Sequence, residues 1–135
     1  AMGARTIYLD CEVLQAGGGT RTAAVTGAYV ALADAVRFGE SQGWWPVGVL
    51  SCAVAAVSTG IVQGRAVVDL DYQEDVTAEV DCNLVMTSAG EWVEVQATAE
   101  RGAFGDAQMG ELISLGRRAI ETLFALQRQA LAEGP

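Results

Sequence analysis

The sequence predicts an α+β domain, in which helices pack on one face of a mostly antiparallel or mixed β-sheet. Two kinds of pattern predict it: short stretches alternate apolar and polar residues with the period of a strand, and two longer stretches repeat apolar residues at helical spacing. In chain order they are expected as one strand, a helix, four strands and a helix. With 135 residues, of which 51% are hydrophobic and two are proline, the chain is long enough to bury the core of a single domain over residues 1–135.

The first strand is expected at residues 5–14 and the first helix at residues 22–38. Ile7, Leu9 and Cys11 alternate with polar neighbours, which is typical of a strand with one buried face. In residues 22–38 small and apolar residues recur at helical spacing, and many of the early ones are alanine or glycine. Such a slim helix can lie close to a sheet or to another helix.

A glycine loop lies between that strand and that helix. Residues 15–23, Gln-Ala-Gly-Gly-Gly-Thr-Arg-Thr-Ala, combine successive glycines with a hydroxyl and a guanidinium. The glycines let several backbone N–H groups converge, and the helix behind them adds unpaired N–H groups and the positive end of its dipole. Arg21 supplies a fork of donors that matches phosphate. The loop therefore predicts a cradle for a small anion such as phosphate, and the alternative is a glycine turn that only joins the strand to the helix.

Four further strands are expected between residues 52 and 98. Residues 52–57 are a continuous apolar run, as in a fully buried strand, and residues 65–70 follow a turn at Gln63-Gly64. In residues 79–86 the apolar positions all fall on one face: Val80, Cys82, Leu84 and Met86. Residues 92–98 follow a turn at residues 88–90 and are expected to pair with residues 79–86 in a hairpin.

The last helix is expected to begin at Asp106, a residue type that caps helix N-termini. Apolar residues recur at helical spacing from Met109 to Leu131, and most of the charged residues lie off that stripe. The helix is therefore amphipathic and is expected to dock by one side.

An acidic cluster precedes and enters the predicted strand at residues 79–86. Its six carboxylates are Asp69, Asp71, Glu74, Asp75, Glu79 and Asp81. Like charges raise one another's pKa values unless solvent or a cation relieves the field. A bend that brings Asp75 and Asp81 together would offer oxygen ligands to Mg²⁺ or Mn²⁺, or a carboxyl group as a proton donor. The alternative is an acidic, solvated loop between two strands.

Composition argues against several classes of function. The chain has no histidine and no Cys-x-x-Cys pair, which argues against a zinc site and against imidazole catalysis. Cys11, Cys52 and Cys82 are expected to be buried free thiols of a reducing compartment. No membrane span or signal peptide is visible, so a cytoplasmic location is expected. The net charge of −9 means that any RNA contact has to be local or use basic residues of another chain.

These features, in this order, resemble the ribonuclease PH family of phosphorolytic 3′ exoribonucleases. Four stretches carry the resemblance: Thr6–Ala16 with Gly18–Ala23, Thr26–Ala35, Asp69–Asn83 and Val93–Glu100. It runs from about residue 3 to residue 131 and implies the ribonuclease PH fold, of the ribosomal S5 domain 2 type. Because the resemblance covers only the C-terminal portion of the family enzyme, we expect a single ribonuclease PH-like domain that lacks the family's N-terminal half.

The resemblance also implies an activity. Gly19, Thr20 and Arg21 would bind inorganic phosphate, and Asp75 and Asp81 would be the catalytic and metal-associated carboxylates, with Mg²⁺ or Mn²⁺. Phosphate would attack the 3′-terminal phosphodiester of RNA and release a nucleoside diphosphate. The family substrate is the 3′ trailer of precursor tRNA, and six subunits form a ring.

Two positions depart from the family pattern, and two other functions stay open. Gly17 stands where the family usually has aspartate, and Ala97 where it usually has glycine. The second hypothesis is a non-catalytic, truncated or scaffolding subunit that needs a partner chain. The third is an unrelated phosphate- or nucleotide-binding α/β protein.

Overall fold

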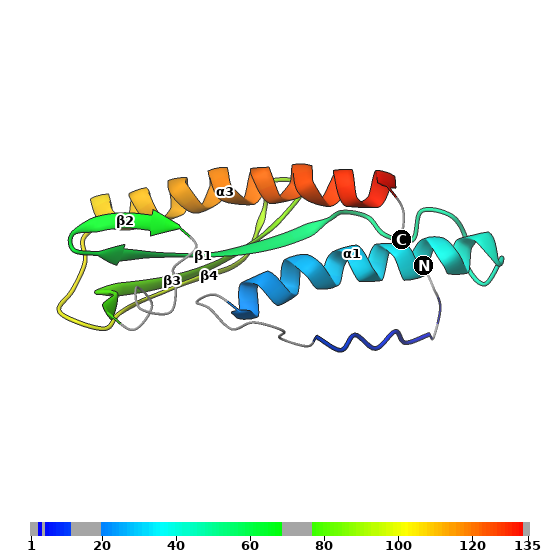
Figure 1. The fold of residues 1–135 in the computed structure, drawn as a ribbon, viewed down its shortest axis with the longest axis horizontal. Helices are drawn as coiled ribbons and strands as arrows, with labels where there is room; N and C mark the ends of the chain where they lie inside the picture. Colours follow the sequence, from blue (N-terminus) through cyan, green and yellow to red (C-terminus); the bar gives the residue numbers. More distant parts are fainter. Residues whose placement is uncertain (1–2, 4, 12–19, 69–76, 134–135) are drawn as a thin grey trace.

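The structure, a computed structural model, describes residues 3, 5–11, 20–68 and 77–133. Two helices and a four-stranded sheet account for most of them (Figure 1). In chain order the elements are α1 (Thr20–Ser41), β1 (Val54–Val62), β2 (Arg65–Val68), β3 (Val80–Thr87), β4 (Trp92–Ala99) and α3 (Asp106–Glu133). The sheet order is β2-β1-β3-β4, and every neighbouring pair is antiparallel. The predicted α+β class is confirmed.

Short turns join the strands as the sequence predicts. Gln63 and Gly64 connect β1 to β2 with φ values of 51° and 76°. Positive φ at both central residues is the requirement of a tight hairpin turn whose twist matches that of the strands. β1 is longer than the predicted residues 52–57. Its middle residues Ser58, Thr59 and Gly60 are not apolar, but they pair with β3, and Thr59 and Gly60 also pair with β2. In β4, Val93 has no partner in the register between the pairs Val85–Glu94 and Met86–Trp92, so it forms a bulge.

The hydrophobic core lies between α3 and one face of the sheet. The face of β3 that was expected to be apolar is buried, with Val80, Cys82, Leu84 and Met86 at 0 to 2% exposure. Leu112, Ile120 and Phe124 of α3 pack in the same cluster. A Cβ atom added at Gly116 would overlap the side chain of Leu84, so this glycine lets α3 approach β3 closely.

Helix α1 lies along β1 and is hydrogen-bonded to its backbone. Among the described residues, the pairing of β1 with β2 extends to Thr59, and the backbone of Ala56 lies beyond it. There Thr26 of α1 binds the backbone of β1: its Oγ1 accepts a hydrogen bond from Ala56 N at 3.0 Å and donates one to Ala56 O at 3.1 Å. An unpaired strand edge leaves polar backbone groups unsatisfied, so these bonds hold α1 in place.

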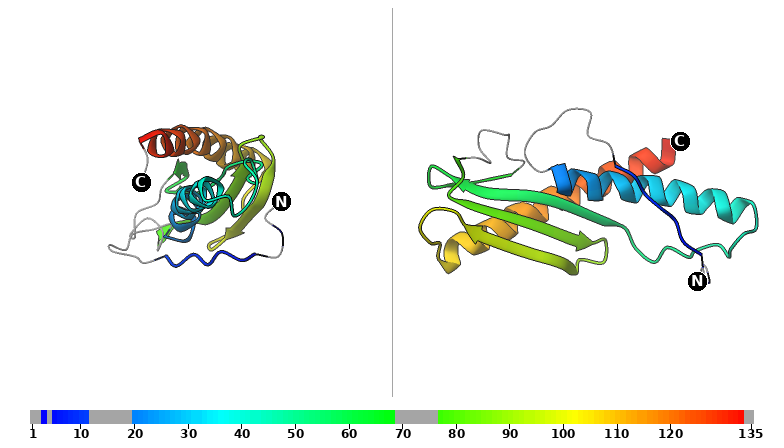
Figure 2. Two further views of the ribbon diagram at one scale, coloured as in Figure 1. Left: turned by 90° about the vertical axis from the view of Figure 1, so that its right-hand side faces the viewer. Right: turned by 90° about the horizontal axis from the view of Figure 1, so that it is seen from below.

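Both helices were expected on one face of the sheet, and α3 alone fits that expectation. Figure 2 shows α3 across one side and α1 alongside β1. The first turn of α1 reaches the opposite face, where Thr22 Oγ1 lies 3.2 Å from Ser58 Oγ. The small residues of α1 let it approach the edge of a strand closely. The same sequence pattern would also fit a helix that approaches the face of a sheet.

The strand predicted at residues 5–14 is not formed in its described part, residues 5–11. Tyr8 is 89% exposed and Leu9 44%. An alternating pattern becomes a strand only when a neighbouring strand accepts its hydrogen bonds, and no described strand pairs with these residues. Residues 12–14 lie outside the described ranges.

Two smaller predictions were also wrong. Cys11 and Cys52 are exposed, and of the three thiols Cys82 is buried as expected. The cap of α3 is Gly105, not Asp106. The Gly105 carbonyl accepts the first helical bond from Met109 N at 3.0 Å, and Gly105 N donates to Gln108 Oε1 at 3.2 Å. The bond from Gly105 N to the Gln108 side chain is one half of a capping box, since glycine has no side chain for the other half. Asp106 is a first-turn residue beside the positive end of the helix dipole.

Within the described ranges, no helix has both the length and the apolar character that crossing a membrane requires.

Candidate phosphate and carboxylate site

The sheet face opposite α3 carries a row of polar side chains. Strand alternation places them there, and the register puts Ser58 of β1 beside Asn83 of β3, Asn83 beside Gln96 of β4, and Asp81 beside Thr98. These residues line a hollow of about 230 Å³. The face is therefore both polar and concave.

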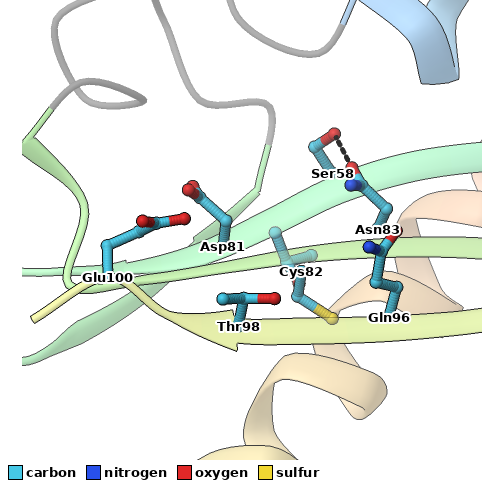
Figure 3. Close-up of a pocket in the computed structure, with 8 residues that line it drawn as sticks. Ser58, Asp81, Cys82, Asn83, Gln96, Thr98 and Glu100 are labelled. Atoms are coloured by element: carbon cyan, nitrogen blue, oxygen red, sulfur yellow. Dashed lines mark hydrogen bonds between the residues drawn. The ribbon is translucent and has the colours of Figure 1, made fainter. Parts of the chain in front are cut away.

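Two carboxylates belong to this hollow. Asp81 is the second residue of β3, and Glu100 follows the end of β4. Figure 3 shows both carboxylates on the same side of the sheet, whereas the sulfur of Cys82 points to the opposite side. Burial raises the pKa of the Cys82 thiol, so this cysteine is a core residue and not a nucleophile of the hollow.

A hydrogen-bonded chain ties the hollow to α1. Ser58 Oγ donates to Asn83 Oδ1 at 2.9 Å, and its oxygen lies 3.2 Å from Thr22 Oγ1. Because the Ser58 hydroxyl has one proton, Thr22 is the donor of the second bond. The first turn of α1 is thus fixed over the polar face, together with the positive end of the helix dipole.

Arg21, in the same first turn, is held by a paired interaction with Glu94 of β4. Arg21 Nη1 donates to Glu94 Oε2 at 3.0 Å, and Nη2 donates to Oε1 at 3.1 Å. The hydrogen bond to Arg21 lowers the pKa of Glu94, and the same bond raises the pKa of Arg21. Glu94 shares its side of β4 with Gln96 and Thr98, so Arg21 lies at the polar face as well.

The predicted site residues divide into two groups. Arg21 and Asp81 are described, and the fold brings them to one face of the sheet from positions 60 residues apart. Thr20 is the first residue of α1. Gly19 and Asp75 lie outside the described ranges, so their predicted roles stay predictions.

Several lining residues were not singled out as site residues from the sequence. Ser58, Asn83 and Gln96 belong to strands whose polar positions look like an ordinary solvated face. Gln96 and Glu100 belong to the family-like stretch Val93–Glu100, to which the resemblance assigned no site residue. Glu94 of the same stretch does not line the hollow but binds Arg21. Polar residues of three neighbouring strands lie side by side in the sheet, and this is what marks the hollow. That arrangement can be recognised only once the strand pairing is known.

The donor set of the hollow is rich in oxygen. Two carboxylates and the amide oxygens of Asn83 and Gln96 line it. Hard cations such as Mg²⁺ prefer such ligands. In the part of the chain that the structure describes, no group of three or more His, Cys, Asp or Glu side chains is arranged to hold a metal ion. The described residues thus provide a partial ligand set.

Comparison with known proteins identifies relatives over almost the whole chain. Residues 52–119 match the model of the 3′ exoribonuclease family, domain 2. Ribonuclease PH of Mycobacterium tuberculosis H37Rv is 54% identical over 133 residues, which are 98% of this chain and 51% of that protein. Ribonuclease PH of Corynebacterium efficiens is 51% identical over 130 residues, which are 96% of this chain and 53% of that protein. The chain spans about half the length of the relatives it matches.

Proposed function

The chain belongs to the 3′ exoribonuclease family of ribonuclease PH, and from this premise we propose that it carries the phosphate and carboxylate groups of a phosphate-dependent 3′-to-5′ exoribonuclease. One observation carries the proposal. Arg21 and Asp81, which the family resemblance assigns to phosphate and to catalysis, lie on the same polar face of the sheet.

In the proposed reaction an oxygen of inorganic phosphate attacks the phosphorus of the 3′-terminal phosphodiester. A new P–O bond forms, and the bond to the 3′ oxygen of the preceding nucleotide breaks. The products are a nucleoside diphosphate and an RNA shorter by one nucleotide, whose 3′ oxygen takes up a proton. Because every reacting group is anionic, catalysis depends mainly on positioning and on charge stabilisation.

The proposed phosphate site consists of Gly19, Thr20 and Arg21. The N-terminal turn of α1 would supply backbone N–H groups and the positive end of its dipole. Arg21 supplies a permanent positive charge with planar donor geometry. Together these groups would hold the attacking phosphate in line with the bond that breaks.

Asp75 and Asp81 are the proposed catalytic carboxylates, and one of them would deliver the proton to the departing 3′ oxygen. They would also hold Mg²⁺ or Mn²⁺, which the oxygen atoms of the hollow suit. When bound, the cation would offset negative charge that develops on the departing oxygen.

The proposed substrate is the 3′ end of precursor tRNA, and the proposed assembly is a homo-oligomer, a six-membered ring in the family. The net charge of −9 supports an assembly in which other chains contribute to RNA binding. Trimming of RNA precursors also fits the expected cytoplasmic location.

A second candidate is a non-catalytic or scaffolding subunit that needs a partner chain. Two observations favour it: the net charge of −9, and Gly17 at a position where the family usually has aspartate. This candidate predicts stable assembly with a partner and no phosphate-dependent product.

The deciding experiment measures nucleoside diphosphate release from a 3′-extended tRNA, with and without inorganic phosphate and Mg²⁺. The chain is assayed alone and after addition of the N-terminal half of Mycobacterium tuberculosis ribonuclease PH. Phosphate-dependent product that Arg21→Ala and Asp81→Ala abolish, and that Arg118→Ala on α3 leaves intact, is the expected result. No product in either arm, with a stable complex in the second, would favour the scaffold.

A further inference from the structure

The pair of Arg21 and Glu94 has a geometry that ordinary surface ion pairs lack. Two parallel N–H···O bonds, at 3.0 and 3.1 Å, connect the first turn of α1 to β4. The side chains are 62% and 30% exposed, respectively. Exposed ion pairs contribute little to folding stability, because solvent screens them and two long side chains lose freedom. The main effect of this pair is therefore on the orientation of the guanidinium.

The pairing leaves one edge of the guanidinium available. A guanidinium has five N–H groups in one plane, and Glu94 takes one from each Nη. Within the described part of the chain, Nε–H makes no hydrogen bond. Nε–H and the adjacent Nη–H point in parallel and match two oxygens of a phosphate. Arg21 can therefore hold Glu94 and a phosphate at the same time, through different edges.

The neighbouring charges explain why such an anchor matters. Asp81 and Glu100 line the hollow on the same face, and a long arginine side chain without an anchor would be attracted to them. Such a pairing would withdraw Arg21 from phosphate and would also occupy the proposed catalytic carboxylate. Glu94, on β4, prevents this by taking the two Nη groups.

We propose that Glu94 is a positioning residue, which fixes the Arg21 guanidinium through its two Nη groups and so presents the Nε edge to inorganic phosphate. This inference rests on the proposed function, because it takes Arg21 as the phosphate-binding residue. Glu94 itself need not touch phosphate.

The test is the affinity of the protein for inorganic phosphate, measured by calorimetry at constant ionic strength. Glu94→Gln keeps the shape of the side chain, loses its charge and keeps one acceptor. Glu91→Gln, in the exposed turn before β4, is the matched control for the loss of one negative charge. Simple electrostatics predicts that both changes tighten phosphate binding, since each removes a repelling carboxylate. Positioning predicts that Glu94→Gln weakens it, by about tenfold, while Glu91→Gln does not.

A double-mutant cycle separates this inference from the proposed function. Once Arg21→Ala has removed the guanidinium, Glu94→Gln should no longer weaken binding. A binding loss in Arg21→Ala with unchanged or tighter binding in Glu94→Gln would overturn the positioning role and leave the phosphate site intact. Unchanged binding in Arg21→Ala, or no binding to the parent chain, would overturn both. Circular dichroism of each variant verifies that the fold is retained, and the NMR signal of Arg21 Nε–H reports directly whether its orientation is lost.

Discussion

Replacement of Gln127 by leucine is expected to lower the free energy of unfolding by about 2 to 3 kcal/mol. Gln127 lies on α3 and is 3% exposed. Its Nε2 donates to the carbonyl of Thr26 on α1 at 3.0 Å and to the carbonyl of Val54 on β1 at 2.9 Å. One side chain thus joins three elements, and leucine has a similar size but no donor.

The magnitude follows from the groups that lose a partner. Each of the two carbonyls loses a hydrogen bond inside the junction, at a cost of about 1.5 to 2 kcal/mol where water cannot replace it. In the other direction, Gln127 Oε1 is buried and has no hydrogen-bond partner among the described residues. Its removal stabilises the folded protein by about 1 kcal/mol, because a buried unsatisfied acceptor disappears.

Urea unfolding followed by circular dichroism measures this difference. Gln129→Leu, on the exposed side of the same helix, is the matched control and should change stability by less than about 0.5 kcal/mol. Hydrogen exchange should show that α1 loses protection first in Gln127→Leu. A Gln127→Leu protein within about 0.5 kcal/mol of the parent would refute the reasoning that this amide holds α1 against β1.

Three further predictions concern packing, titration and thiol chemistry. Gly116→Ala should destabilise the protein by about 1 to 3 kcal/mol in thermal or urea unfolding, because its Cβ overlaps Leu84, whereas Gly110→Ala, whose Cβ meets no atom within 4 Å, should be neutral or stabilising. Because Arg21 lowers the folded-state pKa of Glu94, the pair stabilises the protein above the ordinary carboxyl pKa and loses that contribution as the pH falls through the lowered value. An NMR titration should therefore show the pKa of Glu94 rising in Arg21→Ala, and an unchanged pKa would contradict the pairing. A thiol reagent should modify the two exposed cysteines in the native protein and Cys82 only on unfolding, so that three rapidly reacting thiols would contradict the burial of Cys82.

The sequence was most informative where local pattern and burial agree. The alternation in residues 79–86 predicted β3 and its buried face, because strand geometry alone determines which side chains share a face. Gln63-Gly64 predicted its turn for a similarly local reason, since glycine adopts positive φ readily and Gly64 has a φ of 76°. The stripe on α3, including Gln127, was also visible from spacing.

The same kind of pattern failed where a distant partner decides the outcome. Residues 5–11 alternate as clearly as β3 does, yet no described strand pairs with them. β1 continues past Val57 because β2 and β3 supply ladder partners for its polar middle. Asp106 is a good cap by residue type, but the bonds to Gly105 depend on the path of the chain before α3.

For the site, the sequence alone indicated which residues could bind phosphate or a cation: a glycine loop with Arg21, and an acidic segment that includes Asp75 and Asp81. Tertiary structure alone decided that Arg21 meets Glu94, 73 residues away, and that Asp81 shares a hollow with Glu100, Asn83 and Gln96. The physical reason is that periodicity specifies which face of each element is apolar. It does not specify which polar edges meet when the elements pack, because those contacts depend on strand order, on register and on the path of α1 along β1.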